Sequence, residues 1–173
     1  MLGRTSDAIR TWQRAHRSAL EAGDVDAAVR CAFWLVMELV RRQESAQAGG
    51  WLARMQRLID EREDGGAGGG YLALARGRRA LESGDPAAAA AFFGEADEIA
   101  ARYDDRDLLT LARHAQGRVA IRMGETEDGL SLLDEAMVGV LGGEASPLAA
   151  GSVYCSVLEA CFEILDLRRA QEW

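Results

Sequence analysis

One stretch of the sequence decides the fold: Gly84-Asp85-Pro86-Ala87-Ala88-Ala89-Ala90-Ala91-Phe92-Phe93-Gly94-Glu95-Ala96. It contains the end of one helix, a turn and the start of another helix, because glycine often ends helices and proline suits the first helical turn. Ala89, Phe93 and Ala96 then fall at i, i+4 and i+7, so a small, a large and a small side chain follow one helical face. Such a face predicts close packing against a neighbouring helix.

The same design recurs every 40 or 41 residues along the chain. Its first small residue recurs at Ala8, Ala48, Ala89, Gly129 and Ala170. A period of this length, without the alternation of strands, is typical of stacked helix pairs in which each pair covers the apolar face of the previous one. The sequence therefore predicts an all-α, right-handed helical-repeat solenoid over residues 1–173, a single array that begins and ends in the middle of a repeat.

Turn residues divide the chain into expected helices over residues 5–22, 24–42, 44–63, 71–83, 86–103, 106–123, 126–141, 148–165 and 167–173. The glycine-rich residues 64–70 lack the strand and the lysine that would complete a phosphate-binding loop, so we expect a flexible connector there. Gly49 and Gly50 interrupt the helix over 44–63, and we expect them where a neighbouring backbone comes close.

Composition limits the classes of function. The chain has a net charge of −8 and contains no lysine, which argues against binding a nucleic-acid backbone and excludes a P-loop lysine or a lysine Schiff base. We expect no membrane span and no secretory signal, and therefore a cytoplasmic protein. Three cysteines, Cys31, Cys155 and Cys161, lie in apolar helical runs, and we expect all three as reduced core residues.

The spacing resembles tetratricopeptide repeats in their longer form. The small–large–small positions of the second helix of that motif match Ala8/Trp12/Ala15, Ala48/Leu52/Met55, Ala89/Phe93/Ala96 and Gly129/Leu133/Ala136. The glycine of its first helix matches Gly77 and Gly117, whereas Val36 and Leu158 stand at the equivalent places of the outer repeats. The resemblance implies a right-handed stack of helix pairs.

A second resemblance covers residues 111–118, 124–137, 146–148, 154–157 and 166–173. These segments are similar to the repeat region of large LuxR-type transcription regulators of the MalT-like kind from GC-rich bacteria. That family implies a sensor or scaffold array between a nucleotide-binding module and a C-terminal helix-turn-helix. Neither module has a motif in this chain, so the resemblance implies DNA binding for none of its residues.

In solenoids of this kind the first helix of each helix pair lines the concave face. The 40- or 41-residue repeat places a candidate binding groove on that face. Its residues are Arg41, Tyr71, Arg78, His114, Arg118, Arg122, Glu159 and Glu163. Arg118 and Arg122 are expected to face Glu159 and Glu163 on the next first helix. The groove suits a protein or peptide partner, or a small anionic ligand, with no cofactor, metal, nucleic acid or membrane involved. The alternative is a row of structural ion pairs between repeats.

Two further alternatives stay open at this point. The chain could be a free-standing adaptor, or an enzyme on a helical scaffold with Ser152 or Cys155 as nucleophile and His114 as base, although no oxyanion hole accompanies them.

The helix over 148–165 is apolar on more than one face. We therefore expect its outer face to be covered by a second copy of the chain, as a homodimer, or by a C-terminal continuation.

Overall fold

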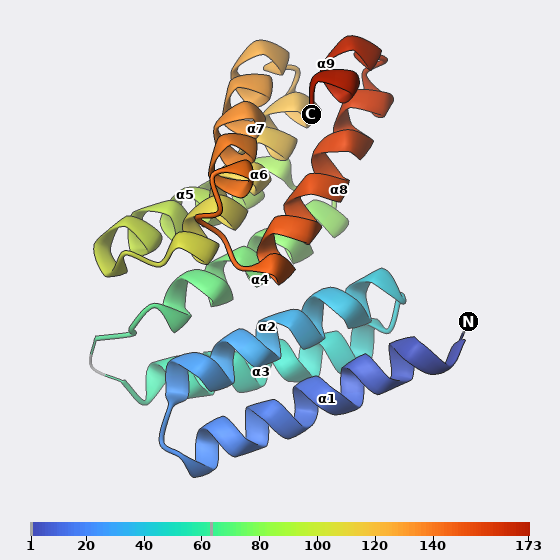
Figure 1. The fold of residues 1–173 in the computed structure, drawn as a ribbon. Coiled ribbons are helices and arrows are strands. Elements are labelled where there is room, and N and C mark those ends of the chain that lie inside the picture. The colour runs from blue at the N-terminus through green and yellow to red at the C-terminus, as the bar shows by residue number, and fades with distance from the viewer. Residues whose placement is uncertain (1, 63) are drawn as a thin grey trace. The chain divides into compact units, whose positions relative to one another are not determined.

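The computed structural model describes residues 2–62 and 64–173, and these residues form nine helices and no strand. The helices pack in consecutive pairs, in a helical-repeat-like arrangement (Figure 1). The chain divides into two compact units, residues 1–76 and 77–173, and helix α4 contributes to both. Within the described residues no helix combines the length and apolar character needed to cross a membrane. The expected all-α class is confirmed.

The first unit consists of α1 (Leu2–Glu21), α2 (Val25–Arg41), α3 (Ser45–Asp60) and the start of α4 (Gly68–Glu82). Helix α2 packs against both α1 and α3. Because it has neighbours on two sides, its apolar residues form the core of the unit: Ala28, Val29, Ala32, Phe33, Leu35, Val36 and Leu39 are buried. This explains why α2 is apolar over most of its circumference.

The second unit contains the end of α4, then α5 (Pro86–Tyr103), α6 (Arg106–Met123), α7 (Thr126–Leu141), α8 (Pro147–Glu163) and α9 (Leu167–Glu172). Each of the helices α5 to α8 packs against the next one, and α6 also packs against α8. The first helices of successive pairs are therefore neighbours, which brings side chains from different repeats onto one surface.

Helix starts follow from aspartate caps and helix ends from left-handed turns. The side chains of Asp24, Asp85, Asp105 and Asp166 each accept a hydrogen bond from the backbone N–H three residues later, at 2.9–3.0 Å. After α4 and α6, Gly84 and Gly124 adopt φ of 78° and 90°, where glycine pays no steric penalty. Gln43 and Leu165 adopt the same left-handed conformation without being glycine.

The register of small residues explains how closely the helices approach. A Cβ atom added at Gly117 would lie 2.7 Å from the carbonyl oxygen of Gly129, and one added at Gly77 would clash with the ring of Phe93. Ala48, Ala89 and Gly129 are buried, whereas Ala8 and Ala170 at the two ends are half-buried. The periodic positions are therefore helix crossings in the middle of the chain, with less cover at its ends.

Three local expectations are corrected. The glycine-rich segment is not simply a flexible connector, because α4 begins at Gly68, whose N–H donates to Asp26 Oδ1 at 2.8 Å. Asp26 also accepts from Arg62 Nη1 at 3.1 Å, which fixes the loop to α2. Gly50 has no heavy atom within 4 Å of an added Cβ, so no neighbouring backbone explains it. All three cysteines are free, but Cys31 is half-buried and Cys155 is exposed, because Cys155 lies on the same exposed face of α8 as Ser152 and Glu159.

Candidate functional site

A polar face of the second unit brings together four of the eight candidate residues. Arg78 comes from α4, His114 and Arg118 from α6, and Glu163 from α8. Arg118 Nη2 donates to Glu163 Oε1 at 3.0 Å, so the expected ion pair between neighbouring first helices is present here. The Arg118 side chain is 20% exposed and Glu163 is 59% exposed, which makes the arginine the anchored partner and the glutamate the accessible one.

The positive charges of Arg78 and Arg118 both act on the ring of His114. Its Nε2 is buried and makes no hydrogen bond to any described residue. Burial, together with the positive charges of Arg118 and Arg78, lowers the pKa of His114 to about 4. The ring is therefore neutral at pH 7 and keeps unused hydrogen-bonding capacity beside two guanidinium groups. An anion placed here would reverse the unfavourable electrostatics.

Arg78 and the other two candidates of the second unit, Arg122 and Glu159, do not form the expected ion pairs between neighbouring first helices. Arg78 pairs with Glu82 on its own helix at 3.6 Å, and both side chains are about half exposed. Arg122 and Glu159 are exposed, and within the described residues no ion pair joins Arg122 to Glu159 or Glu163. The expected double row is therefore a single inter-helix pair. Arg122 lies one turn further towards the end of α6, where its side chain remains in solvent.

The remaining two candidates, Arg41 and Tyr71, belong to the first unit. Arg41 is exposed and forms hydrogen bonds with Glu38 at 2.6 and 3.0 Å, within its own helix. Tyr71 is only 2% exposed, and its ring centroid lies 5.4 Å from that of Phe33. The expectation that Tyr71 lines an open groove is wrong, because its large ring packs into the core of this unit. Arg30 stands over the same ring at 6.0 Å.

The structure gives the nucleophile–base alternative no support. Ser152 and Cys155 are both exposed on α8, and no hydrogen bond joins either side chain to His114 in the described part of the chain. Across residues 2–62 and 64–173, no group of three or more histidine, cysteine or acidic side chains could hold a metal ion.

Sequence reasoning missed a buried polar cluster in the first unit. His16 is 2% exposed; its Nδ1 lies 2.8 Å from the carbonyl oxygen of Ala28, and its Nε2 accepts from Arg54 Nε at 2.8 Å. Its ring meets the Trp51 ring edge-on at 5.0 Å, and Arg54 stands over that ring at 5.8 Å. Burial, opposed in part by the hydrogen bond to Ala28, lowers the pKa of His16. The partners are far apart in sequence, so no spacing signal reveals them.

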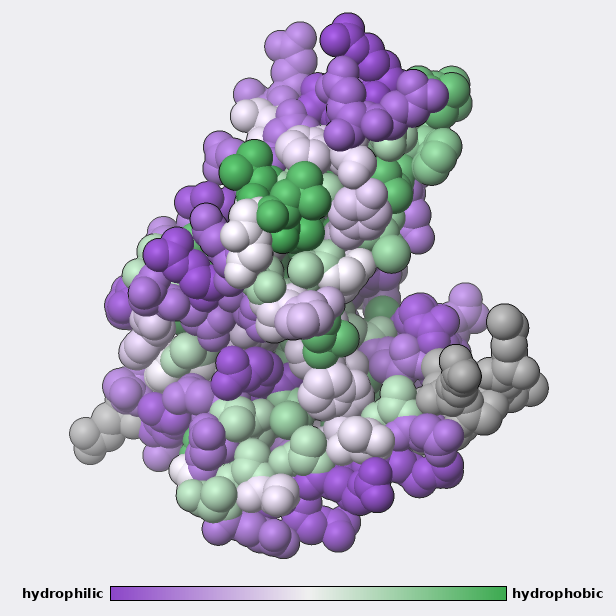
Figure 2. All heavy atoms as spheres, in the orientation of Figure 1, coloured by the Kyte–Doolittle hydropathy of each residue, from purple (hydrophilic) through white to green (hydrophobic). Residues whose placement is uncertain are grey.

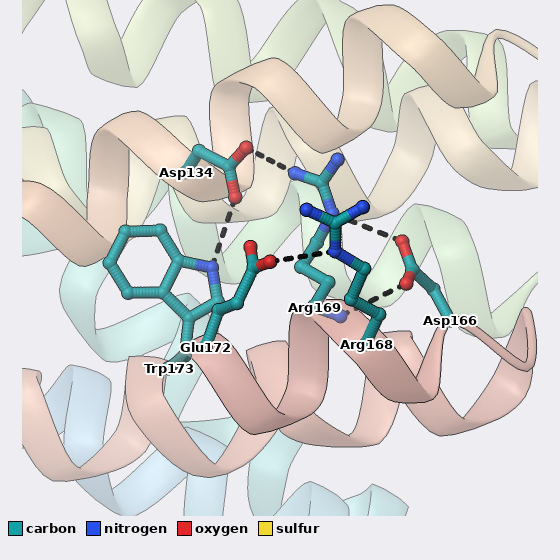
Figure 3. Close-up of polar contacts among 6 residues, drawn as sticks. All are labelled: Asp134, Asp166, Arg168, Arg169, Glu172 and Trp173. Carbon is teal, nitrogen blue, oxygen red and sulfur yellow. Dashed lines mark hydrogen bonds and ion pairs between the residues drawn. The ribbon is translucent and has the colours of Figure 1, made fainter.

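A second missed cluster holds the short helix α9 in place (Figure 3). Arg169 donates to Asp134 of α7 and, at 3.2 Å, to Asp166. Trp173 Nε1 donates to the other oxygen of Asp134 at 3.1 Å, and Tyr154 of α8 donates to the carbonyl oxygen of Trp173 at 2.8 Å. Asp134 thus receives hydrogen bonds from a residue within the last helix and from the residue that follows it.

Comparison with known proteins gives a fold but no family. No family model matches the chain, and no curated protein matches it. Among solved structures it is similar to the crystal structure of BtubC (BKLC) from P. vanneervenii, with a TM-score of 0.59 and 19% sequence identity over 96% of this chain and 68% of that chain. At this level of identity, the likeness shows a common helical fold alone.

Proposed function

We propose that this chain is a binding module of the helical-repeat type that recognises an acidic protein segment or peptide. Its helix pairs form a right-handed, tetratricopeptide-like solenoid, and the polar face of the second unit is the binding surface. The observation that carries the proposal is the convergence of Arg78, His114 and Arg118, with the buried His114 Nε2 left without a hydrogen-bond partner. Buried polar groups are nearly always paired, so an unpaired one beside two cations favours an anionic ligand.

The role of Glu163 follows from this proposal. Its carboxylate is the accessible partner in the ion pair with the Arg118 guanidinium, at 3.0 Å, and it forms this pair when no ligand is bound. A carboxylate of the partner would take its place, because a charge-assisted pair with arginine is favourable for either carboxylate. Glu163 therefore sets the affinity by competition, and its removal is expected to strengthen binding.

The wider setting that we propose is a cytoplasmic, LuxR-type transcription regulator of the MalT-like kind, in which this array is the sensor or scaffold. This part of the proposal rests on the sequence resemblance alone. The reading frame that encodes the chain tests it: a nucleotide-binding module before the array and a helix-turn-helix after it are expected. A reading frame without either module favours the free-standing adaptor instead.

Binding can be measured with the full chain and a fluorescein-labelled peptide of alternating glutamate and leucine, by fluorescence anisotropy. Arg118→Gln is expected to weaken binding at least about tenfold, since it removes a charge-assisted hydrogen bond. Arg168→Gln is the matched control, because it removes the same charge from a side chain that is 89% exposed on α9. A lysine–leucine peptide that binds as tightly would contradict the proposal.

Nuclear magnetic resonance of the histidine rings gives a second readout. The acidic peptide is expected to raise the pKa of His114 from about 4, because a nearby anion stabilises the imidazolium. His16, whose two nitrogens already have partners, is the internal control and should not shift. Peptide binding without any shift of His114 would place the site elsewhere.

A further inference from the structure

An exposed apolar cluster lies where α8 ends and α9 begins. Phe162 is 59% exposed, Leu165 is 80% exposed and Leu167 is 53% exposed. We call these three residues the α8–α9 apolar cluster. Figure 2 shows green atoms at the end of α8, at the upper right, next to the polar α9. Three large apolar side chains within six residues form a concentrated patch.

Leu165 is unfavourable at its position for two separate reasons. It ends α8 in a left-handed turn with φ of 61°, and its N–H bonds to Phe162 while the N–H of Asp166 bonds to Cys161. Gly84 after α4 and Gly124 after α6 stand at the same position of the same kind of turn. A leucine at this position is strained, whereas a glycine is not. The same leucine also exposes most of its side chain to water. Folding gains nothing from it in either respect.

The charges around the cluster are already compensated inside the chain. Glu163 pairs with Arg118 at 3.0 Å, Asp166 with Arg169 at 3.2 Å, and Arg168 with Glu172 at 2.9 Å. The chain as a whole carries a net charge of −8, so two copies repel each other over most of their surface. Glu163, Asp166 and Glu172 at this corner each have a basic partner, which lowers the negative charge that a second copy would meet there.

We propose that the α8–α9 apolar cluster docks against the same cluster of a second copy of this chain, in a symmetric homodimer. A two-fold axis at this corner buries Leu165 against the partner copy and sets Arg168 opposite the partner copy's acidic side chains. Helix α9 carries Arg168 and Glu172 one turn apart on its surface, so the two copies can exchange these ion pairs. An interface that is complementary to itself is what a two-fold dimer requires.

The test uses Leu165→Gly in the full chain. This substitution relieves the strained backbone turn and removes an apolar side chain from the cluster, so its effect on stability and its effect on association differ in direction. Glycine suits the left-handed turn, so the melting temperature should rise or stay unchanged, while the dimer should dissociate at least about tenfold more readily. Gln43→Gly is the matched control: Gln43 has φ of 60° in the corresponding turn after α2 and is not apolar. It should affect stability in the same direction and leave association unchanged.

Analytical ultracentrifugation from about 1 to about 200 µM measures association, and a concentration-dependent shift from monomer to dimer is expected within this range. Phe162→Gln is the second variant and should also weaken the dimer. A strict monomer of the 173-residue chain overturns the proposal and leaves another protein or a following segment as the occupant. A dimer that survives both Leu165→Gly and Phe162→Gln overturns it as well.

Discussion

Arg54 donates a hydrogen bond from Nε to Nε2 of His16 at 2.8 Å, across two helices of the first unit. The acceptor nitrogen must be unprotonated for this bond to form, and the other ring nitrogen, 2.8 Å from the Ala28 carbonyl, must carry the hydrogen. The fold therefore specifies one neutral tautomer of His16. Protonation would place a cation against Arg54 inside the core.

The first prediction is that acid destabilises the protein before its carboxylates titrate. The pKa of both histidines is lowered from 6.5 in the folded state, and that of His114 is about 4. The unfolded chain therefore binds more protons as the pH falls below 6.5, so the free energy of unfolding decreases. Each histidine contributes at most about 1.4 kcal/mol per pH unit. Chemical denaturation at several pH values measures the slope.

Two variants show which histidine causes this pH dependence. In His114→Gln the free energy of unfolding should still fall with pH because of His16. In the His16→Gln/His114→Gln double variant it should be nearly constant between pH 6.5 and about pH 5. A double variant with the full slope of the parent would show that other groups govern the acid sensitivity.

The second prediction concerns the crossing of α6 and α7. Gly117→Ala adds a Cβ atom 2.7 Å from the backbone oxygen of Gly129, which cannot move aside like a flexible side chain. We expect a loss of roughly 1–3 kcal/mol in stability, as for other overpacked sites. Gly94→Ala, in the middle of α5 with nothing within 4 Å, is the control and should gain about 0.5–1 kcal/mol. Equal effects of the two substitutions on thermal unfolding would contradict the close crossing.

The third prediction concerns the ion pair of Arg118 and Glu163. Arg118→Glu places two carboxylates together and should lower stability, whereas adding Glu163→Arg should restore most of the loss. The coupling energy is expected to be about 1 kcal/mol or less, because Glu163 is 59% exposed. The same cycle for Arg122 and Glu159, both exposed without a common contact, should give no coupling. Coupling in the second cycle alone would reverse our assignment.

The fourth prediction concerns the attachment of α9. A helix of six residues is not stable by itself, so its place depends on Asp134, which accepts from Arg169 and Trp173. Asp134→Ala should cost roughly 1–3 kcal/mol, because it leaves two donors without their acceptor. It should also make the last residues sensitive to carboxypeptidase. Arg168→Ala removes an exposed ion pair within α9 but no contact with α7, so it should do neither.

The sequence by itself determined the helices and their register. Local signals carried this information: the caps Asp85 and Asp105 and the turn glycines Gly84 and Gly124 act within a few residues of their own helix. The expected helices over 86–103, 106–123 and 126–141 therefore have the bounds of α5, α6 and α7. The spacing of Ala89, Phe93 and Ala96 also predicted a buried stripe correctly, because helical geometry fixes which residues share a face.

Only the tertiary structure decided which polar side chains meet. Arg54 reaches His16, Arg169 reaches Asp134 and Arg118 reaches Glu163 across 38, 35 and 45 residues of sequence. Helix periodicity gives the direction of a side chain from its own axis, but not the rotation and height of the neighbouring helix. Tyr71 illustrates the difference: it was expected on an open face and is buried against Phe33, because the packing of α4 on α2 decides its surroundings.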